Sequence, residues 1–206
     1  MRYGTKMIRV LFPSIVCETN SASVHLTFDD GPHHEATPRV LEILRKYDVK
    51  ATFFVVGDNV LKFPDIVREA HKMGHMIANH SLTHQNLFLR GRPFVLSGIR
   101  RCNEIVSQTV GVIPSNFRPP RGLFDSTTLR AASDLGTTFT LWSVDSRDFE
   151  TYNSRRNAEF VINKTHPGSI VLLHDNEATS PGVRDFLPRV LEGLLARNFS
   201  FEPLPR

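Results

Sequence analysis

Two adjacent carboxylates, Asp29 and Asp30, follow an apolar run and precede the turn-forming pair Gly31-Pro32. The run at 24–28 is typical of a buried strand that Gly-Pro ends, so both carboxylates are expected at its carboxyl end. Neighbouring residues of an extended chain point to opposite sides. One carboxylate could therefore hold a metal ion while the other transfers a proton. Taken alone, the same residues could equally form a solvated turn.

Two histidines four residues apart, His80 and His84, follow another strand-like run. At this spacing both imidazoles would reach the same side of a helical turn and could bind one ion. With Asp30 they would form a three-ligand site with open positions, which suits a catalytic Zn²⁺, with Co²⁺ or Mn²⁺ also possible. The alternative is a buried polar network of the same three side chains without a metal.

Three further clusters follow strand-like segments. Arg118 begins Arg-Pro-Pro-Arg-Gly, where it could pair with a carboxylate, although such a loop is more often structural. Asp145 lies at the end of a strand-like run, with the aromatic Phe149 four residues later. His174 ends the apolar run at 171–173. It could be a satisfied core residue, but a histidine with a pKa near neutrality could also protonate a leaving group.

The elements that must position these side chains alternate along the chain. This alternation predicts parallel βαβ units in an α/β fold, either as an open sheet or as a trimmed barrel. Both architectures gather the carboxyl ends of the strands at one edge, where the clusters would meet. Strands are expected at 24–28, 51–56, 75–79, 115–117, 137–144, 169–173 and 199–204, and helices at 37–47, 64–73, 94–110, 126–135, 160–165 and 183–197.

Length and composition indicate one domain. The chain has 206 residues, of which 40% are hydrophobic and 22% charged, within the range of a single core. Residues 1–23 are expected to be a lead-in segment that packs across a domain at 24–206. The net charge of +4 is spread without a run of like charges, so nucleic acid is not implied. No protein partner follows from the sequence.

Cysteine and hydropathy patterns exclude several classes of protein. Cys17 and Cys102 are too few for a disulfide scaffold and lack the spacing of a zinc knuckle. The apolar patch at 7–16 is interrupted by Arg9 and Pro13, so it makes a poor secretory signal. No apolar window approaches the ~20 residues of a membrane span. A soluble, uncleaved and cytoplasmic chain is therefore expected.

Together the clusters resemble the polysaccharide deacetylase family, also called the NodB-homology domain or carbohydrate esterase family 4. The resemblance runs from about residue 24 to 204. It rests on Thr-Phe-Asp-Asp-Gly-Pro, His-Ser-Leu-Thr-His, Arg-Pro-Pro-Arg-Gly, the segment around Asp145 and Leu-Leu-His-Asp, in the family's order. Ala-Thr-Phe-Phe-Val-Val-Gly at 51–57 also resembles the family's second strand. The resemblance implies a distorted, TIM-barrel-like (β/α)7 barrel, a divalent metal that is usually zinc, and deacetylation of N-acetylated sugars.

The resemblance also implies roles for the first three clusters. Asp29 would be the catalytic base, and Arg118 would orient it. Asp30, His80 and His84 would be the metal ligands. The substrate would be N-acetylglucosamine in chitooligosaccharide, peptidoglycan or a related glycan.

In the remaining clusters the resemblance makes His174 the acid that protonates the departing amine and Asp145 the carboxylate that orients it. Leu172 would line the pocket for the acetyl methyl group. Arg121 stands where the family usually has a tyrosine, so its backbone N–H would stabilise the oxyanion while its side chain alters glycan fit. Phe149 replaces the usual tryptophan of the groove wall.

Trp142 begins the same cluster and is expected to contact substrate with Phe149. Within the same mechanism, an O-acetyl esterase or an amidase on a small nitrogenous substrate are alternatives. A non-catalytic glycan-binding module with the same fold is the alternative from another class. Such modules commonly lose a metal ligand or the base, and this sequence retains both.

Overall fold

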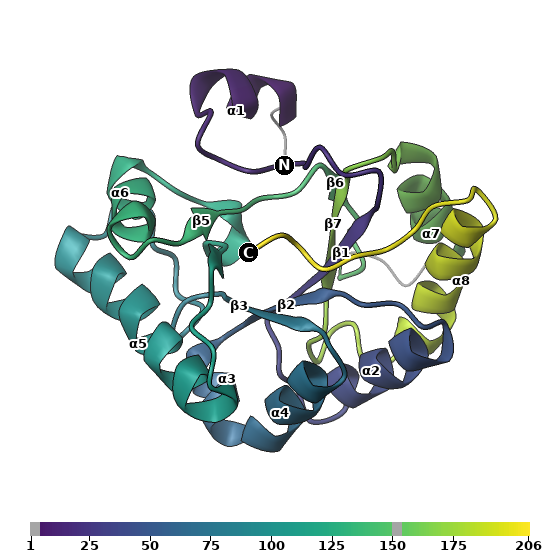
Figure 1. The fold of residues 1–206 in the computed structure, drawn as a ribbon, viewed down its shortest axis with the longest axis horizontal. Coiled ribbons are helices and arrows are strands. Elements are labelled where there is room, and N and C mark those ends of the chain that lie inside the picture. Colours follow the sequence, from purple (N-terminus) through teal and green to yellow (C-terminus); the bar gives the residue numbers. More distant parts are fainter. Residues whose placement is uncertain (1–4, 150–153) are drawn as a thin grey trace.

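Seven parallel strands form one curled sheet. The computed structural model describes residues 5–149 and 154–206. The strands are β1 (His25–Asp29), β2 (Thr52–Val55), β3 (Met76–Asn79), β4 (Asn116–Phe117), β5 (Thr138–Phe139), β6 (Val144–Asp145) and β7 (Ile170–His174). Their spatial order is β5-β4-β3-β2-β1-β7-β6. The sheet curls into part of a barrel that stays open between β5 and β6, as the expected distorted (β/α)7 barrel requires (Figure 1).

Helices cover the outer face of the curled sheet, except for the N-terminal helix, which lies over the open side (Figure 1). Their apolar faces pack on the strands. Every strand except β5 is followed by a helix, so these pairs form crossover units of the kind expected from the alternation. The helices are α1 (Thr5–Leu11), α2 (Ala36–Lys46), α3 (Gly57–Lys62), α4 (Pro64–Lys72), α5 (Arg92–Val110), α6 (Ser126–Asp134), α7 (Ser154–Lys164) and α8 (Val183–Leu195), with a 3₁₀ turn, η1, at Pro120–Gly122.

The central strands β1 and β7 alternate between two hydrophobic clusters. Leu26 and Phe28 of β1 belong to the cluster beneath the outer helices. Leu172 of β7 belongs to a second cluster, on the inner side of the barrel. Because side chains alternate along a strand, Asp29 leaves β1 on the inner side. Asp29 and His174 are opposite each other in the β1–β7 register, so the carboxyl ends of these strands bring both groups together.

The prediction of a single strand at 137–144 is wrong. The segment is divided into β5 and β6, which lie at opposite edges of the sheet. Between them Leu141 donates its backbone N–H to Val16 O at 2.8 Å, so the N-terminal segment takes the place of a sheet neighbour. The strand expected at 199–204 is also absent from the described residues. Only an isolated bridge between Val24 and Phe201 occurs there.

Three helices differ from expectation. Neither α1 nor α3 was expected, and α7 begins at Ser154 rather than at residue 160. The other expected helices are confirmed with small shifts at their ends. Asp125 caps α6, because its side chain accepts the backbone N–H of Thr128 at 2.8 Å.

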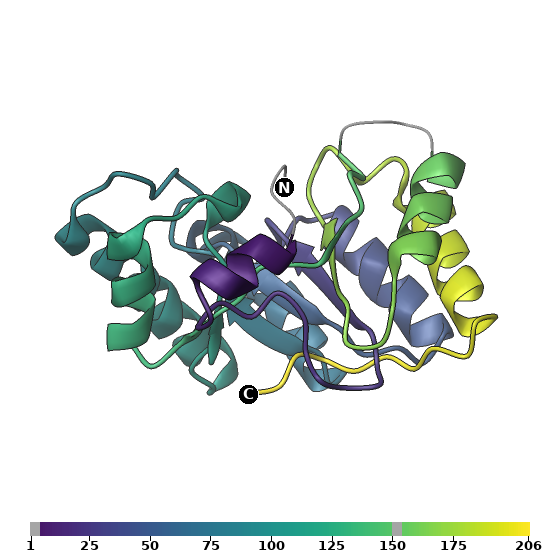
Figure 2. The same ribbon diagram turned by 90° about the horizontal axis from the view of Figure 1, so that it is seen from above.

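The N-terminal segment spans the open side of the barrel. Val16 forms a bridge with Thr140 beside β5, and Glu18 forms a bridge with Ser169 before β7. Ile15 is only 3% exposed and packs in the inner cluster. Figures 1 and 2 both place α1 across this opening. The division into a lead-in at 1–23 and a domain at 24–206 stays a prediction.

The state of the two cysteines and the apolar character of the helices can be compared with what the sequence predicts. Cys17 and Cys102 are both buried and carry no disulfide. Among the described residues, no helix combines the length and the apolar composition that crossing a membrane demands.

Candidate active site

Asp29 forms a buried ion pair with Arg118. Arg118 Nη1 donates to Asp29 Oδ1 at 2.6 Å, and neither side chain is more than 5% exposed. The guanidinium also donates to Thr27 Oγ1 at 2.9 Å and to Leu141 O at 2.9 Å. It lies 4.0 Å from the centroid of the Phe54 ring. These contacts fix the guanidinium, which therefore holds one carboxylate oxygen of Asp29 and leaves the other free for chemistry.

Asp30, His80 and His84 form a cluster that could hold a metal ion. One donor atom from each residue lies within 4.8 Å of the others. Asp30 Oδ1 is 2.9 Å from His84 Nε2 and 3.5 Å from His80 Nε2. One carboxylate and two imidazoles make a donor set that suits Zn²⁺ with open positions. The residues therefore fit the expected metal.

Supporting contacts orient the metal-site side chains. His80 Nδ1 lies 2.8 Å from Arg118 O, so with Nδ1 protonated its Nε2 presents a lone pair to the cluster. Asn176 Nδ2 donates to Asp30 Oδ2 at 2.8 Å. The expected helical turn between His80 and His84 is wrong. His84 has a φ of 56°, and the intervening loop directs both Nε2 atoms to Asp30 without a helix.

The charge state of Asp30 follows from these neighbours. Burial raises the pKa of Asp30, but its contacts with His80 and His84 lower that pKa by more. The pKa of Asp30 consequently lies well below its usual value. The carboxylate is ionised at all physiological pH values, as a metal ligand must be.

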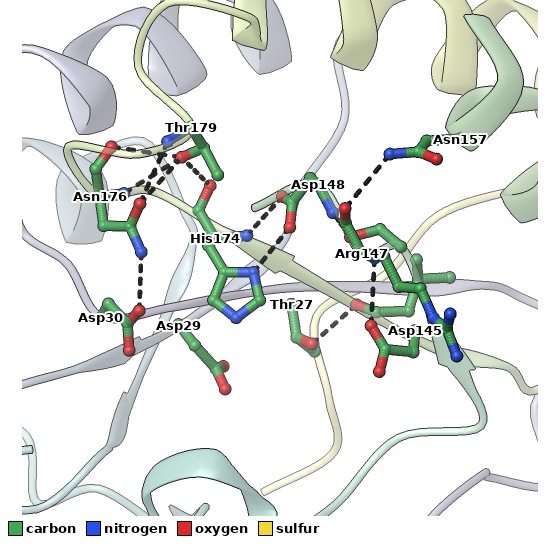
Figure 3. A network of polar contacts seen from close by, with 12 residues as sticks. Thr27, Asp29, Asp30, Asp145, Arg147, Asp148, Asn157, His174, Asn176 and Thr179 are labelled. Carbon is green, nitrogen blue, oxygen red and sulfur yellow. Dashed lines mark hydrogen bonds and ion pairs between the residues drawn. The ribbon is translucent and has the colours of Figure 1, made fainter. Parts of the chain in front are cut away.

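His174 is held by Asp148, not by Asp145 as expected. His174 Nδ1 lies 2.7 Å from Asp148 Oδ1, and the backbone N–H of His174 donates to Asp148 Oδ2 at 2.9 Å (Figure 3). Asp145 instead accepts the backbone N–H of Arg147 at 3.1 Å (Figure 3). The reason is local: Arg147 has a φ of 52°, and the chain turns there so that Asp148 reaches the end of β7. Asp148 lies in the expected cluster, but its role was missed.

Asp148 also sets the protonation of His174. Burial lowers the pKa of His174, but the hydrogen bond and charge of Asp148, with further charge from Asp29 and Asp30, raise it to about 9. His174 is thus protonated at neutral pH and can donate a proton from Nε2. Phe149 packs edge-on against the imidazole, with ring centroids 5.0 Å apart.

A cavity of about 890 Å³ lies over these groups. Every expected site residue except Arg118, which lies behind Asp29, contributes to its lining. Leu172 is 3% exposed and lies two residues before His174, so both side chains leave β7 on the same side. The expected contact residues on the lining are Arg121, Trp142, Phe149 and Leu172.

A second buried carboxylate, Asp175, supports the loop after β1 and was not expected. Asp175 Oδ2 accepts the Thr37 hydroxyl at 2.6 Å, and Oδ1 accepts the backbone N–H of Gly31 at 3.1 Å. A side chain at position 31 would collide with this carboxylate, so Gly31 permits the close approach. Burial raises the pKa of Asp175 well above its usual value. The Leu-Leu-His-Asp motif included Asp175, but its sequence gave no sign of this contact.

Comparison with known proteins decides the family. Residues 17–140, more than half of the chain, match the family model described as polysaccharide deacetylase. The chain belongs to the polysaccharide deacetylase family. The resemblance drawn from the motifs is therefore confirmed, and with it the expectation of a deacetylase.

Curated members of the polysaccharide deacetylase family are similar over most of the chain. A peptidoglycan-N-acetylglucosamine deacetylase of Bacillus cereus is 35% identical over 187 residues, which cover 90% of this chain and 68% of that protein. A chitooligosaccharide deacetylase of Azorhizobium caulinodans is 36% identical over 200 residues, covering 90% of this chain and 94% of the relative.

A solved polysaccharide deacetylase superimposes on nearly the whole structure. This is the crystal structure of the Bc1960 peptidoglycan N-acetylglucosamine deacetylase in complex with 4-naphthalen-1-yl-N-oxidanyl-benzamide. The TM-score is 0.91 at 32% identity, with 96% of this chain and 94% of the other covered. The expected barrel is confirmed by this match.

Proposed function

We propose that this protein removes acetyl groups from N-acetylated amino sugars of a glycan, with a divalent metal held by Asp30, His80 and His84. The observation that carries the proposal is the meeting of three features at one edge of the sheet. These are the Arg118–Asp29 pair, the three-donor cluster and the protonated His174. Hydrolysis of an amide needs a base, an oxyanion-stabilising charge and an acid, and this edge offers all three.

Asp29 is the proposed base. Its Oδ1 is engaged by Arg118, while its Oδ2 lies 3.8 Å from His80 Nε2, on the metal-site side. Oδ2 is thus placed to accept the proton of a water that attacks the acetyl carbonyl carbon. The ion pair with Arg118 fixes the orientation of the Asp29 carboxylate. The backbone N–H of Arg121 is the proposed donor to the oxyanion.

His174 is the proposed acid. When the C–N bond of the acetamido group breaks, the sugar amine must take up a proton to leave as a neutral group. His174 Nε2 is free to supply it, because Nδ1 is held by Asp148. Asp148 also stabilises the imidazolium, and it takes the orienting role that was expected for Asp145. Leu172 is proposed to contact the acetyl methyl group.

Zinc is the proposed ion, since one carboxylate and two imidazoles form a common zinc donor set, and Co²⁺ or Mn²⁺ can occupy similar sites. A bound divalent ion would polarise the acetyl carbonyl and lower the pKa of water. The relatives named for peptidoglycan and for chitooligosaccharide support N-acetylglucosamine as the sugar. Trp142 and Phe149 are proposed to contact its ring.

The test combines metal analysis with acetate release. Purified protein is stripped with a chelator, reloaded with Zn²⁺, Co²⁺ or Mn²⁺, and incubated with N-acetylglucosamine oligomers or peptidoglycan fragments. We expect one ion per chain and acetate release that disappears on stripping and returns on reloading. His84→Gln should lose both, whereas His166→Gln, an exposed histidine outside the cavity, should retain both. Acetate release that is insensitive to stripping, or no release from either glycan, would overturn the proposal.

A further inference from the structure

Helix α1 and the residue after it form one wall of the catalytic cavity. Met7, Ile8, Leu11 and Phe12 line the same cavity as the proposed catalytic groups. Met7 and Leu11 are four residues apart and so lie on the same face of α1. The N-terminal segment therefore belongs to the site as well as to the barrel.

This wall is anchored on both sides. Ile8 is 8% exposed and packs in the inner hydrophobic cluster with Leu141 and Trp142. Phe12 donates its backbone N–H to Ile8 O at 2.7 Å, and its ring packs edge-on against Phe124 with centroids 5.4 Å apart. Contacts with the inner cluster and with the loop after η1 thus fix the position of α1 relative to the catalytic groups.

The exposed part of the wall is apolar. We call Met7, Leu11, Phe12 and Leu123 the N-terminal wall; these side chains line the cavity and are 47%, 62%, 39% and 43% exposed. Clustered exposed apolar side chains mark a binding surface more often than isolated ones do. The hydroxyl groups of a sugar need hydrogen-bond partners when they are buried, and these four side chains offer no strong donor or acceptor. A hydrocarbon matches this surface better than a sugar does.

The place of the wall in the cavity indicates which part of a substrate would reach it. The acetyl methyl group is assigned to Leu172, which is buried inside the barrel. The N-terminal wall lies at the exposed rim, so it would contact the part of the substrate that leads away from the acetamido group. The cavity volume of about 890 Å³ is in the upper part of the ~300–1,000 Å³ range of ligand pockets, which leaves space beside a sugar ring.

We infer that the substrate is an amphiphilic glycoside, an N-acetylated amino sugar whose glycosidic side carries a hydrocarbon group that packs on the N-terminal wall. The inference rests on the proposed deacetylase function and names the substrate class of the same site. The hydrocarbon is assigned to the aglycone and not to the acyl group, because the acetyl methyl group is already assigned to Leu172, which is buried, whereas the N-terminal wall is exposed.

A binding measurement that does not depend on turnover tests the inference. The chain has a single tryptophan, Trp142, which lines the cavity, so its fluorescence reports ligand binding there. Octyl and methyl β-glycosides of N-acetylglucosamine are titrated below the critical micelle concentration, and acetate release from both is measured in parallel. We expect the octyl glycoside to bind at least about tenfold more tightly, the factor supplied by burying roughly two methylene groups. Equal affinities would overturn the inference.

Matched variants on α1 localise the effect. Leu11→Ser should remove most of the preference for the octyl glycoside, measured as the ratio of the affinities for the octyl and methyl glycosides. Val10→Ser is the control, because Val10 lies on the same helix, is 81% exposed and is outside the cavity lining. An octyl preference that survives Leu11→Ser, or that Val10→Ser removes equally, would count against the N-terminal wall. A wall-dependent octyl preference without acetate release from metal-loaded protein would support this site and overturn the proposed function.

Discussion

Asp29 and Asp30 are neighbours in the chain but have different partners. Asp29 is held by the buried guanidinium of Arg118, whereas Asp30, with a φ of 79°, turns toward His80 and His84. The guanidinium engages one oxygen of Asp29, and the second oxygen remains available to take a proton. The division of labour that two adjacent carboxylates allow is therefore realised by their environments.

Replacing the base separates catalysis from metal binding. Asp29→Asn should lower kcat by at least about a hundredfold, because the amide cannot accept a proton in the attack step. Metal content should be unchanged, since Asp29 is outside the three-donor cluster. Acetate release and elemental analysis on the same preparation measure both. Asp65→Asn, at an exposed position, is the matched control, and a loss of bound metal in Asp29→Asn would contradict the assignment.

Asp148 and Asp145 can be distinguished by the pH dependence of the reaction. The acid form of His174 is needed, so kcat/KM should fall as pH rises through the pKa of His174. Asp148→Asn removes the charge that raises this pKa, so the alkaline limb should move to lower pH by about one to three units.

The control for this shift is Asp145→Asn, which changes a neighbouring carboxylate of the same motif. Asp145 accepts from the backbone of Arg147 and is not the carboxylate that holds the ring of His174. Its replacement should leave the alkaline limb in place. If Asp145→Asn shifts the limb and Asp148→Asn does not, the original expectation from the family resemblance is restored.

The sequence predicted the groups that directly follow strands and missed those placed by loop geometry. Asp29 and His174 could be predicted because each ends an apolar run. Asp148 could not be chosen over Asp145, since that choice depends on the left-handed backbone of Arg147, which no residue type at that position signals. The contact of Asp175 with the loop after β1 depends on the β1–β7 register, which only the sheet defines.

At the scale of elements, prediction succeeded where amphipathic periodicity and end signals agree. Helix α4 begins at Pro64 in the first helical turn and ends before Gly74, which has a φ of 85°. Helix α3 was missed because its N-cap, Val56, supplies no capping side chain and the helix has only six residues. The division of the segment 137–144 was missed because a continuous β-branched and apolar run does not show which residues leave the sheet.

Two helix glycines provide opposite tests of helix packing. A Cβ at Gly98 of α5 would meet no atom within 4 Å, so Gly98→Ala should stabilise the protein by about 1 kcal/mol through helix propensity. A Cβ at Gly193 of α8 would fall against Ile162 of α7 closer than van der Waals contact. Overpacking of this kind costs about 1–3 kcal/mol, so Gly193→Ala should be less stable than Gly98→Ala.

Thermal unfolding of both glycine variants beside the parent protein checks these values. In a chain of this size a change of about 1 kcal/mol shifts Tm by roughly 2–4 °C. We expect Tm to rise for Gly98→Ala and to fall, or at best to stay level, for Gly193→Ala. A larger rise for Gly193→Ala would show that α7 and α8 pack less closely than the structure indicates.

At the scale of the whole molecule, the barrel is completed by the N-terminal segment, which was expected to lead into the domain and to pack across it. The edge strands β5 and β6 do not pair in the described structure. Instead, Val16 forms a bridge with Thr140, after β5, and Glu18 forms one with Ser169, before β7. Such long-range pairing leaves no periodic pattern in a short segment. The sequence therefore indicated that the segment packs across the domain, but not that the barrel is open between β5 and β6. The same segment carries the N-terminal wall, which links closure of the barrel to the shape of the substrate site.

Ile15 measures how far the domain at 24–206 depends on the segment before it. Ile15 is 3% exposed in the inner cluster, so Ile15→Ala should lower the free energy of unfolding by about 2–5 kcal/mol through lost burial and a cavity. Ile113→Ala is the matched control: Ile113 is 66% exposed, and the change should stay within about 0.5 kcal/mol. Urea unfolding of both variants gives the comparison, with equal m-values showing that the unfolded state is unaffected. If residues 1–23 were a dispensable lead-in, Ile15→Ala would behave like Ile113→Ala. A large difference between the two variants in the free energy of unfolding would instead make the segment part of the folding unit. A single cooperative transition would then depend on contacts between residues 1–23 and the domain at 24–206.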